Sequence, residues 1–347
     1  MSSGRGLTRK SGFKPKKQKG VALISVLLAV ALCVILATEI LTAQKLQVQR
    51  TQNLLERQQA YWYAMGAEQF IKTLLQRTLK QDKGVVNLEQ SWAMEGMTFP
   101  IDNGLIEGQV YDLHQCFNIN SLYNPAWSEE KRKKHKEVFV RYLSSLDITS
   151  ELSEEDLTNN IVDWLDPDNY PVEAVGYDGD MYSSMPFPYL SANSPLANES
   201  ELRVIYGFDV LVMTQLQNKL CVIPNNSQFQ INVNTLDNQE PELLAALLNI
   251  DSEKAKDILA ERPEKGFEDL ADFWALSSVK GLKNIADVDK SQFTVQSKFF
   301  KLVTSAHYND MKFDLTSVLQ MDEQNIAHVI ARRFGGRIER KADPETE

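Results

Sequence analysis

The sequence predicts an α+β fold in which a long N-terminal helix packs against an antiparallel sheet, with a large, mainly α-helical domain inserted in the sheet domain. Three observations predict it. Residues 21–80 join an apolar run to an amphipathic continuation and contain no proline. Alternating segments typical of paired strands lie far apart, at residues 97–113 and 292–334. The chain between them is mostly helical or irregular in its pattern.

The first part of the helix is long enough to cross a membrane. From Gly20 to Thr38 no residue is charged, and a bilayer core of about 30 Å needs about 20 helical residues. Residues 1–20 hold seven Lys or Arg and no acid, which predicts a cytoplasmic N-terminus and a chain that emerges on the other side. A cleaved secretory signal is the alternative, but Leu41-Thr42-Ala43 puts a large residue where cleavage needs a small one. We predict a basic leader at 1–20 and a transmembrane part at 21–41.

The helix is expected to continue beyond the membrane within the next domain, residues 42–114. Residues 42–80 carry apolar side chains at helical spacing: Leu54, Leu55, Tyr61, Trp62, Met65, Ile71, Leu74, Leu75 and Leu79. We expect the three aromatic residues at 61–63 to anchor this helix to a sheet.

Strand pairs are predicted at both ends of the globular part. Asp102-Asn103-Gly104 is a strong hairpin signal within 97–113. Near the C-terminus, 292–305 and 311–320 are expected to turn at Asn309-Asp310, followed by a strand at 328–334. These strands make a C-terminal part at 291–334, which leaves 115–290 as the inserted helical domain. The charged tail, 335–347, is predicted to be disordered.

Charge and cysteine content limit the possible partners. The formal net charge is −10, and removal of the seven leader cations leaves −17 on residues 21–347. Such a surface repels nucleic acid and anionic lipid and attracts cations. Cys33 lies in the membrane run, so Cys116 and Cys221 are the possible pair outside it. They could form a disulfide in an oxidising compartment or remain two buried thiols.

The insert contains one internal echo, Phe117-Asn-Ile-Asn-Ser-Leu122 and Ile231-Asn-Val-Asn-Thr-Leu236. Each is expected to cap a following helix with its polar side chains. The second opens a segment, 231–282, that is similar to the helix-hairpin-helix pattern of some DNA-uptake proteins. The hairpin at 249–251 lacks glycine, and acids crowd the module, so its chemistry argues against phosphate binding. We interpret it as a packing module.

An acidic loop spans 163–200 and gathers six carboxylates into eighteen positions. A loop this long inside a compact domain is disordered or held by another group, and its aromatic residues favour packing. Clustered carboxylates suit Ca²⁺, which takes six to eight oxygens. A solvated acidic loop is the alternative. The candidate calcium ligands are Asp163, Asp166, Asp168, Glu173, Asp178 and Asp180.

Nothing in the sequence predicts an enzyme. Paired carboxylates such as Asp163 and Asp166 could serve a glycoside hydrolase, but the four histidines show no metal-ligand spacing. No Gly-x-Ser-x-Gly, His-Glu-x-x-His or phosphate-loop motif is present.

The N-terminus resembles a type IV prepilin signal, in which a basic residue and glycine precede an apolar helix. The resemblance implies cleavage by prepilin peptidase between Gly20 and Val21. Most such subunits carry Glu as the fifth mature residue, where this chain has Ser25. The minor pseudopilin K family of type II secretion systems typically lacks that acid. Residues 59–68 and the pattern Asp163-Trp-Leu-Asp166, Asp178–Tyr182 and Glu201-Leu-Arg are similar to the same family.

This resemblance covers nearly the whole chain and implies a function and partners. The protein would be a single-pass subunit of the inner membrane with a periplasmic domain of pilin-like fold. With the I and J minor pseudopilins and the major pseudopilin it would initiate the pseudopilus and cap its tip, without binding nucleic acid. The resemblance also implies calcium in the acidic loop. The alternative function is a membrane-anchored, DNA-binding minor pilin of an uptake system.

Overall fold

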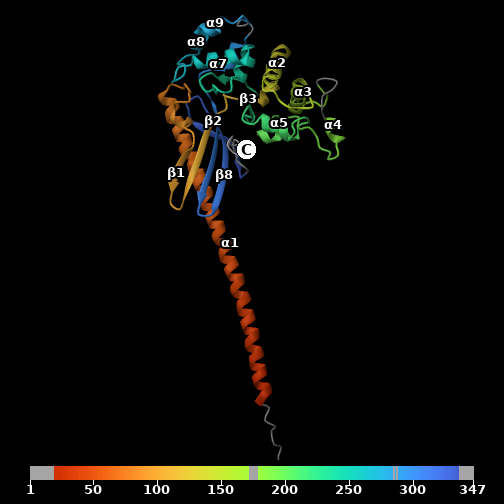
Figure 1. The fold of residues 1–347 in the computed structure, drawn as a ribbon, viewed down its shortest axis with the longest axis vertical. Helices are drawn as coiled ribbons and strands as arrows, with labels where there is room; N and C mark the ends of the chain where they lie inside the picture. The colour runs from red at the N-terminus through yellow and green to blue at the C-terminus, as the bar shows by residue number, and fades with distance from the viewer. Residues whose placement is uncertain (1–18, 172–178, 284–285, 287, 336–347) are drawn as a thin grey trace, which may run out of the picture. The chain divides into compact units, whose positions relative to one another are not determined.

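The computed structural model describes residues 19–171, 179–283, 286 and 288–335 (Figure 1). The chain forms two compact units, residues 1–58 and 59–347. The helices are α1 (Lys19–Gln81), α2 (Glu129–Ser145), α3 (Glu154–Leu165), α4 (Gly179–Ser183), α5 (Val210–Gln215), α6 (Glu242–Leu248), α7 (Ser252–Ala260), α8 (Leu270–Ala275) and α9 (Ser277–Lys280). The strands are β1 (Met97–Ile101), β2 (Gly104–Asp112), β3 (Phe117–Asn118), β4 (Leu220–Cys221), β5 (Ile231–Asn232), β6 (Phe293–Thr294), β7 (Phe299–Tyr308), β8 (Met311–Met321) and β9 (Ala327–Phe334).

The described part of the first unit is the beginning of α1. Every residue from Gly20 to Leu55 is exposed, although most of the first twenty are apolar. Among the described residues, α1 is the one helix that is long and apolar enough to cross a membrane. Its length and composition are consistent with a single-pass anchor, because a bilayer would cover side chains that no part of the protein covers.

In the second unit the rest of α1 packs on a five-stranded sheet of order β1-β2-β7-β8-β9, all antiparallel. The hairpin turns at 102–103 and 309–310 are where the sequence predicts them. One predicted strand is wrong in extent: 292–305 divides into the short β6 and then β7, because Phe293 pairs with β5 of the insert instead of the sheet. The long N-terminal helix, the antiparallel sheet and the helices inserted between β2 and β7 confirm the predicted pilin-like α+β fold.

The buried face of α1 differs from the predicted stripe. Ile71, Leu75 and Leu79 are buried against the sheet as expected, together with the small Ala60 and Ala64. Small side chains let the helix approach the strands closely. Leu54 and Leu55 are exposed and belong to the first unit.

The aromatic triplet acts only in part as the predicted anchor. Tyr61 contacts Phe313 edge-on and Tyr63 packs near Tyr308. Trp62 lies edge-on to Tyr61, with ring centroids 5.1 Å apart, and is 58% exposed. Helical geometry explains the difference, since three consecutive residues cannot all face one sheet.

The segment between β2 and β7 holds α2 to α9 and lies at the end of the sheet where these strands meet it (Figure 1). Its largest core is continuous from Phe117 to Val295. Two parallel strand pairs organise it, β3 with β4 and β5 with β6. Each pair joins the start of one module to its end, so the insert consists of two successive closed modules.

Candidate functional site

The predicted processing residues lie on an exposed helix. Gly20 and Val21 are in the first turns of α1, and a Cβ added at Gly20 would meet no atom within 4 Å. Ser25 donates its hydroxyl hydrogen bond to the carbonyl of Ala22, at 2.9 Å. The side chain at position 25 is therefore neutral and satisfied within its own helix.

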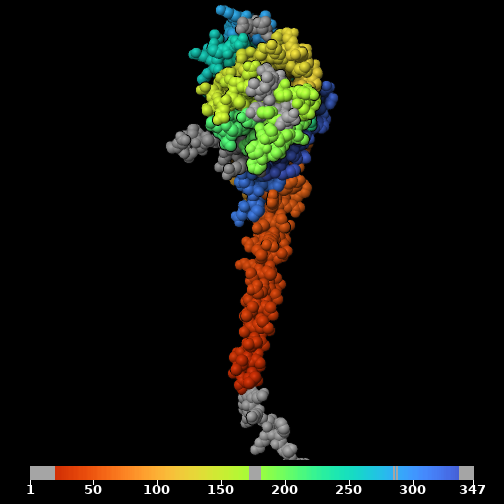
Figure 2. Space-filling model, turned by 90° about the vertical axis from the view of Figure 1, so that its right-hand side faces the viewer, coloured from red at the N-terminus to blue at the C-terminus, as the bar shows by residue number. Residues whose placement is uncertain are grey.

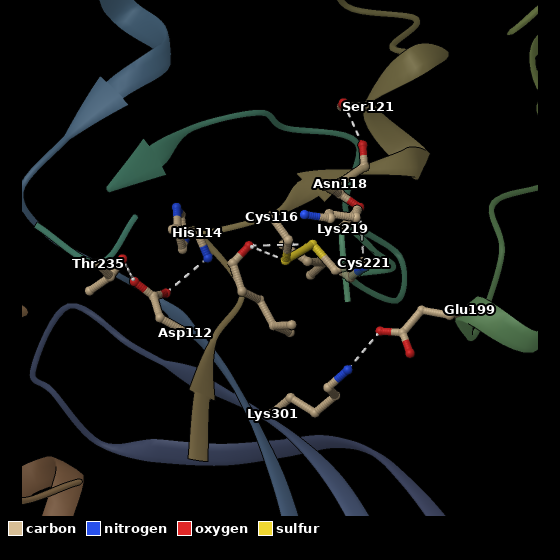
Figure 3. Close-up of a disulfide and its surroundings, with 12 residues drawn as sticks. Asp112, His114, Cys116, Asn118, Ser121, Glu199, Lys219, Cys221, Thr235 and Lys301 are labelled. Atoms are coloured by element: carbon tan, nitrogen blue, oxygen red, sulfur yellow. Dashed lines mark hydrogen bonds and ion pairs between the residues drawn. A yellow bond between two sulfur atoms is a disulfide. The ribbon is translucent and has the colours of Figure 1, made fainter. Parts of the chain in front are cut away.

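Cys116 and Cys221 form a disulfide whose Cα atoms lie 5.8 Å apart (Figure 3). Both residues are buried, and both Sγ atoms lie 3.7 Å from the carbonyl oxygen of Leu113. The bond joins the two ends of the first module directly beside the last residues of β2. It therefore fastens the insert at its connection to the sheet.

Asp112, the last residue of β2, forms the polar centre of this junction (Figure 3). It is fully buried and accepts hydrogen bonds from the hydroxyls of Thr235 and Ser297, each at 2.6 Å, and from the backbone N–H of His114 at 2.8 Å. His114 follows β2 and Ser297 precedes β7, whereas Thr235 belongs to the second module. One buried carboxylate thus joins three separate segments. Their hydrogen bonds compensate for the water that the carboxylate loses on burial.

His114 is held as a neutral ring at the same junction. Burial lowers its pKa, an effect that the neighbouring Asp112 carboxylate partly opposes. Nε2 lies 3.3 Å from the backbone N–H of Lys298 and accepts from it, so Nδ1 carries the proton and donates to the carbonyl of Gln230, at 3.0 Å.

The asparagines of the repeated motif do not cap helices, so that prediction is wrong. Asn120 accepts from the N–H of Leu196 and donates to its carbonyl, at 2.8 and 2.9 Å. Asn234 binds Phe267 in the same two-point way, at 2.7 and 3.0 Å. Both amides are buried. Hydroxyl and carboxylate side chains cap the nearby helices instead, as Ser128 does for α2.

The two buried candidate calcium ligands lie together at the C-terminal end of α3. Asp163 is fully buried and Asp166 is 5% exposed. Asp168 is exposed, and its carboxylate accepts the backbone N–H of Tyr170 at 2.9 Å. Glu173 and Asp178 lie outside the described residues, as does the side chain of Asp180. Within the described residues no three His, Cys, Asp or Glu side chains form a group that could hold a metal ion.

The acidic loop is closed at its neck by protein contacts. Asn193 donates to the carbonyl of Asp168 and to the side chain of Asn169, at 2.8 and 2.7 Å. The buried Tyr182 packs against Trp164 of α3, with ring centroids 5.3 Å apart. Tyr182 and Tyr189 thus pack the loop onto α3 as predicted, whereas Phe187 is 86% exposed.

In the helix-hairpin-helix-like segment, hydrogen bonds within the protein already occupy the backbone N–H groups of Ile250 and Lys254 at the hairpin. Asn249 ends α6 in the left-handed conformation at φ 52°, and the N–H of Ile250 binds the carbonyl of Ala245. Asp251 caps α7 and pairs with Lys254. A phosphate would meet a carboxylate at this hairpin, which agrees with a packing role.

One ion pair that the sequence did not suggest fastens α1 to the sheet. Arg332 of β9 donates two hydrogen bonds to Glu68, both 2.8 Å long, and Ser317 of β8 donates a third at 2.6 Å. Burial raises the pKa of Glu68, but these hydrogen bonds outweigh burial and hold it below its ordinary value. Glu68 is separated from its partners by more than two hundred residues, so no local signal could have shown them.

Comparisons with known proteins agree with this architecture. Two family models described as type II secretion system protein K match residues 115–225 and 231–296, which correspond to the two modules. Type II secretion system protein K of Aeromonas hydrophila is 32% identical over 334 residues, covering 92% of this chain and 98% of the relative. The protein of the same name from Pectobacterium carotovorum is 33% identical, with 92% and 97% covered.

A solved structure gives the same result. A chain of the GspK-GspI-GspJ complex from the type 2 secretion system of enterotoxigenic Escherichia coli aligns with a TM-score of 0.74 and 28% identity. The alignment covers 83% of this chain and all of that chain. With both modules matched and relatives similar over almost their full lengths, the chain belongs to the type II secretion system protein K family.

Proposed function

We propose that this protein is a minor pseudopilin that starts pseudopilus assembly together with I-type and J-type subunits and then caps the tip. The observation that carries the proposal is its similarity to a chain of a solved complex in which a K subunit is bound to I and J subunits. In this proposal the role is structural and not enzymatic.

The charge and length of the N-terminus support insertion in the inner membrane. The seven leader cations favour a cytoplasmic N-terminus, which places the globular unit in the periplasm. Prepilin peptidase would remove residues 1–20 and leave Val21 as the new N-terminus. Ser25 offers no carboxylate for the N-terminal amine of a neighbouring subunit. The protein would therefore add poorly to a pseudopilus after a major pseudopilin subunit.

The location of the insert supports a capping role. Tyr61 meets β8 and β9 near Phe313 and Phe334, whereas Leu75 and Leu79 pack near Phe300, where β7 begins. The insert therefore lies at the end of the sheet far from residue 59. Two helical modules there would block the addition of another subunit beyond this one.

The proposal is tested by locating the subunit and by changing Ser25. We expect gold-labelled antibody to find the protein at pseudopilus tips, and the purified full chain in detergent to bind its I-type and J-type partners. Ser25→Glu should move part of the label to the shaft, because the acid would pair with a neighbouring amine. Ser25→Ala is the matched control and should leave the label at the tip. Wild-type label along the whole shaft would show the capping proposal to be wrong.

We further propose that the acidic loop binds a structural Ca²⁺ through Asp163 and Asp166, with Asp168, Glu173, Asp178 and Asp180 as the other candidate ligands. The donor chemistry fits a hard cation, because two buried carboxylates lie at the negative C-terminal end of α3. Bound calcium would supply positive charge to these carboxylates. The protein's own contribution is the closed neck and the aromatic packing that bring the ends of the loop together.

A further inference from the structure

A groove lies on the outer face of the sheet, which is the face opposite α1. Along β7, Phe300 and Leu302 pack toward α1, so the alternating Lys301 and Val303 point to the other side. The insert covers only part of that face, and the groove between them has a volume of about 320 Å³. We call it the outer groove, and the lining residues that carry the argument below are Glu199, Lys301, Val303, Val318, Ala331 and Arg333.

The walls of the outer groove are fixed by contacts within the protein. Lys301 and Glu199 form an ion pair at 3.0 Å that links β7 to the insert (Figure 3). Asn198 caps the turn that carries Glu199 by accepting from the N–H of Ser200 at 3.0 Å. Figure 2 shows the green atoms of the segment around 197–222 next to the blue atoms of the C-terminal strands. A ligand would therefore meet a preformed site.

The floor of the groove is apolar. Val303, Val318 and Ala331 lie on three neighbouring strands and are only partly covered. Outward-facing positions of a sheet that meets water are usually polar. The remaining edge of the sheet, β9, borders the groove and has no strand paired on its other side within the described residues.

The charge around this floor is opposite to that of the rest of the chain. Arg203, Lys301 and Arg333 line the groove, with Arg332 at its border, against the single carboxylate of Glu199. Glu199 is occupied by Lys301, and Arg332 is bound to Glu68 on the other face. Residues 21–347 as a whole carry a net charge of −17. Arginine binds carboxylates in a two-pronged geometry, which makes this concave surface selective for acidic groups.

We propose that the outer groove binds an extended acidic segment of a partner protein, in which apolar side chains rest on Val303 and Val318 and carboxylates reach Arg333. The proposal does not depend on the pseudopilin function. The opposite charge of the groove and its apolar floor carry it together, since alternating apolar and acidic residues place the two kinds of side chain on separate faces of an extended segment.

The test uses the full chain in detergent micelles and fluorescent ten-residue probes. One probe alternates Asp and Leu, a second alternates Lys and Leu, and a third alternates Asp and Ser. We expect the Asp/Leu probe to bind best, by fluorescence anisotropy, and to weaken with added salt. Arg333→Glu and Val303→Ser should each weaken it about tenfold. Lys312→Glu is the control, because Lys312 is a cation of the same sheet face, ion-paired to Asp314, outside the groove.

Each other outcome would overturn the proposal. Equal binding by Lys312→Glu and Arg333→Glu would show attachment elsewhere. Preference for the Lys/Leu probe would mean that the acidic body of the protein dominates. Unchanged melting temperatures will show that the variants are folded, so that their weaker binding reports on the groove. A failure of the wild-type protein to bind the Asp/Leu probe would by itself contradict the inference.

Discussion

At the scale of single residues, buried polar side chains decide how the insert is built. Asn120 and Asn234 each satisfy both backbone groups of one distant residue, Leu196 and Phe267. A Cβ at Gly266, which has φ of +73°, would come within 2.6 Å of Asn234, so the glycine lets the amide approach. The repeated motif was visible in the sequence. Its role was not, because a cap and a long-range clamp use the same side chain and differ only in the fold.

Asn120 offers a direct test of this clamp. Asn120→Ala should lower the free energy of unfolding by about 2–4 kcal/mol, because two buried backbone groups of Leu196 lose their partner. Chemical denaturation of the full chain in detergent would measure it. Asn53→Ala changes the same residue type at an exposed position of α1 and should have almost no effect. Equal losses for the two variants would contradict the clamp.

His135 makes the stability of the insert depend on pH. Ser121 donates its hydroxyl to the carbonyl of Asn118, so His135 donates from Nε2 to Ser121 at 2.9 Å, while Nδ1 accepts from Gln292 at 3.3 Å. Burial first, and then the charge of Lys131, lowers its pKa from 6.5 to about 3. The folded protein therefore holds this ring neutral, whereas the unfolded chain protonates near pH 6.5.

The sign of the effect follows from linkage. The contribution of the neutral His135 ring to the free energy of unfolding is fully present above pH 6.5. It is lost progressively as pH falls toward 3, and the loss reaches about 2 kcal/mol at pH 5. Urea unfolding at pH 7.5 and pH 5 would measure it, and His135→Gln should reduce the difference. Burial also lowers the pKa of His114, so part of the pH dependence of stability should remain in the His135→Gln variant. His307→Gln, at a partly exposed ring, is the control, and an unchanged slope in His135→Gln would refute this account.

At the scale of elements, periodicity predicted what lies close in sequence and failed where distant segments meet. The hairpin turns and β8 follow local turn chemistry and alternation. The strand predicted at 292–305 was interrupted because Phe293 and Thr294 pair with β5, some sixty positions earlier. This pairing could not be derived from a single segment. The exposure of Trp62, by contrast, follows from helical geometry alone, since three consecutive residues cannot all face one sheet.

The acidic loop is the element whose behaviour calcium should change. Added Ca²⁺ is expected to raise the melting temperature of the full chain in detergent, corresponding to about 2.7 kcal/mol at one hundred times the dissociation constant. Mg²⁺ should do much less, because it prefers a smaller octahedral site. Asp163→Asn with Asp166→Asn should abolish the response.

The control for this titration changes acids away from the loop. Glu253→Gln with Asp257→Asn alters two carboxylates of α7 and should keep the calcium response. The contact of Asn193 at the neck and the contact of Asn120 with Leu196 use no metal, so the insert should remain folded in a chelator. If Ca²⁺ and Mg²⁺ stabilise the protein equally, or the α7 variant loses the response, the loop is only a solvated acidic segment.

At the scale of the whole molecule, composition predicted which part of the chain is an apolar anchor segment and which part is globular. An uncharged apolar run preceded by cations is typical of a membrane anchor, and the exposure of its side chains in the structure is consistent with one. The disulfide is different. Two cysteines 105 positions apart could be paired or free by sequence alone, and only the parallel pairing of β3 with β4 brings their Cα atoms within 5.8 Å.

Processing at Gly20 is the prediction that concerns the entire chain. Co-expression with prepilin peptidase should yield a protein that lacks residues 1–20, begins at Val21 and stays in the membrane, as intact mass and N-terminal sequencing would show. Gly20→Val should block the cut. Since a Cβ at position 20 meets no atom within 4 Å, the fold tolerates this change, and any loss of cleavage reports on the peptidase. Gly6→Val in the leader is the control and should be cut normally. Cleavage after residue 43, with release from the membrane, would instead make the helix a secretory signal and remove the physical basis for assembly beside other pseudopilin helices.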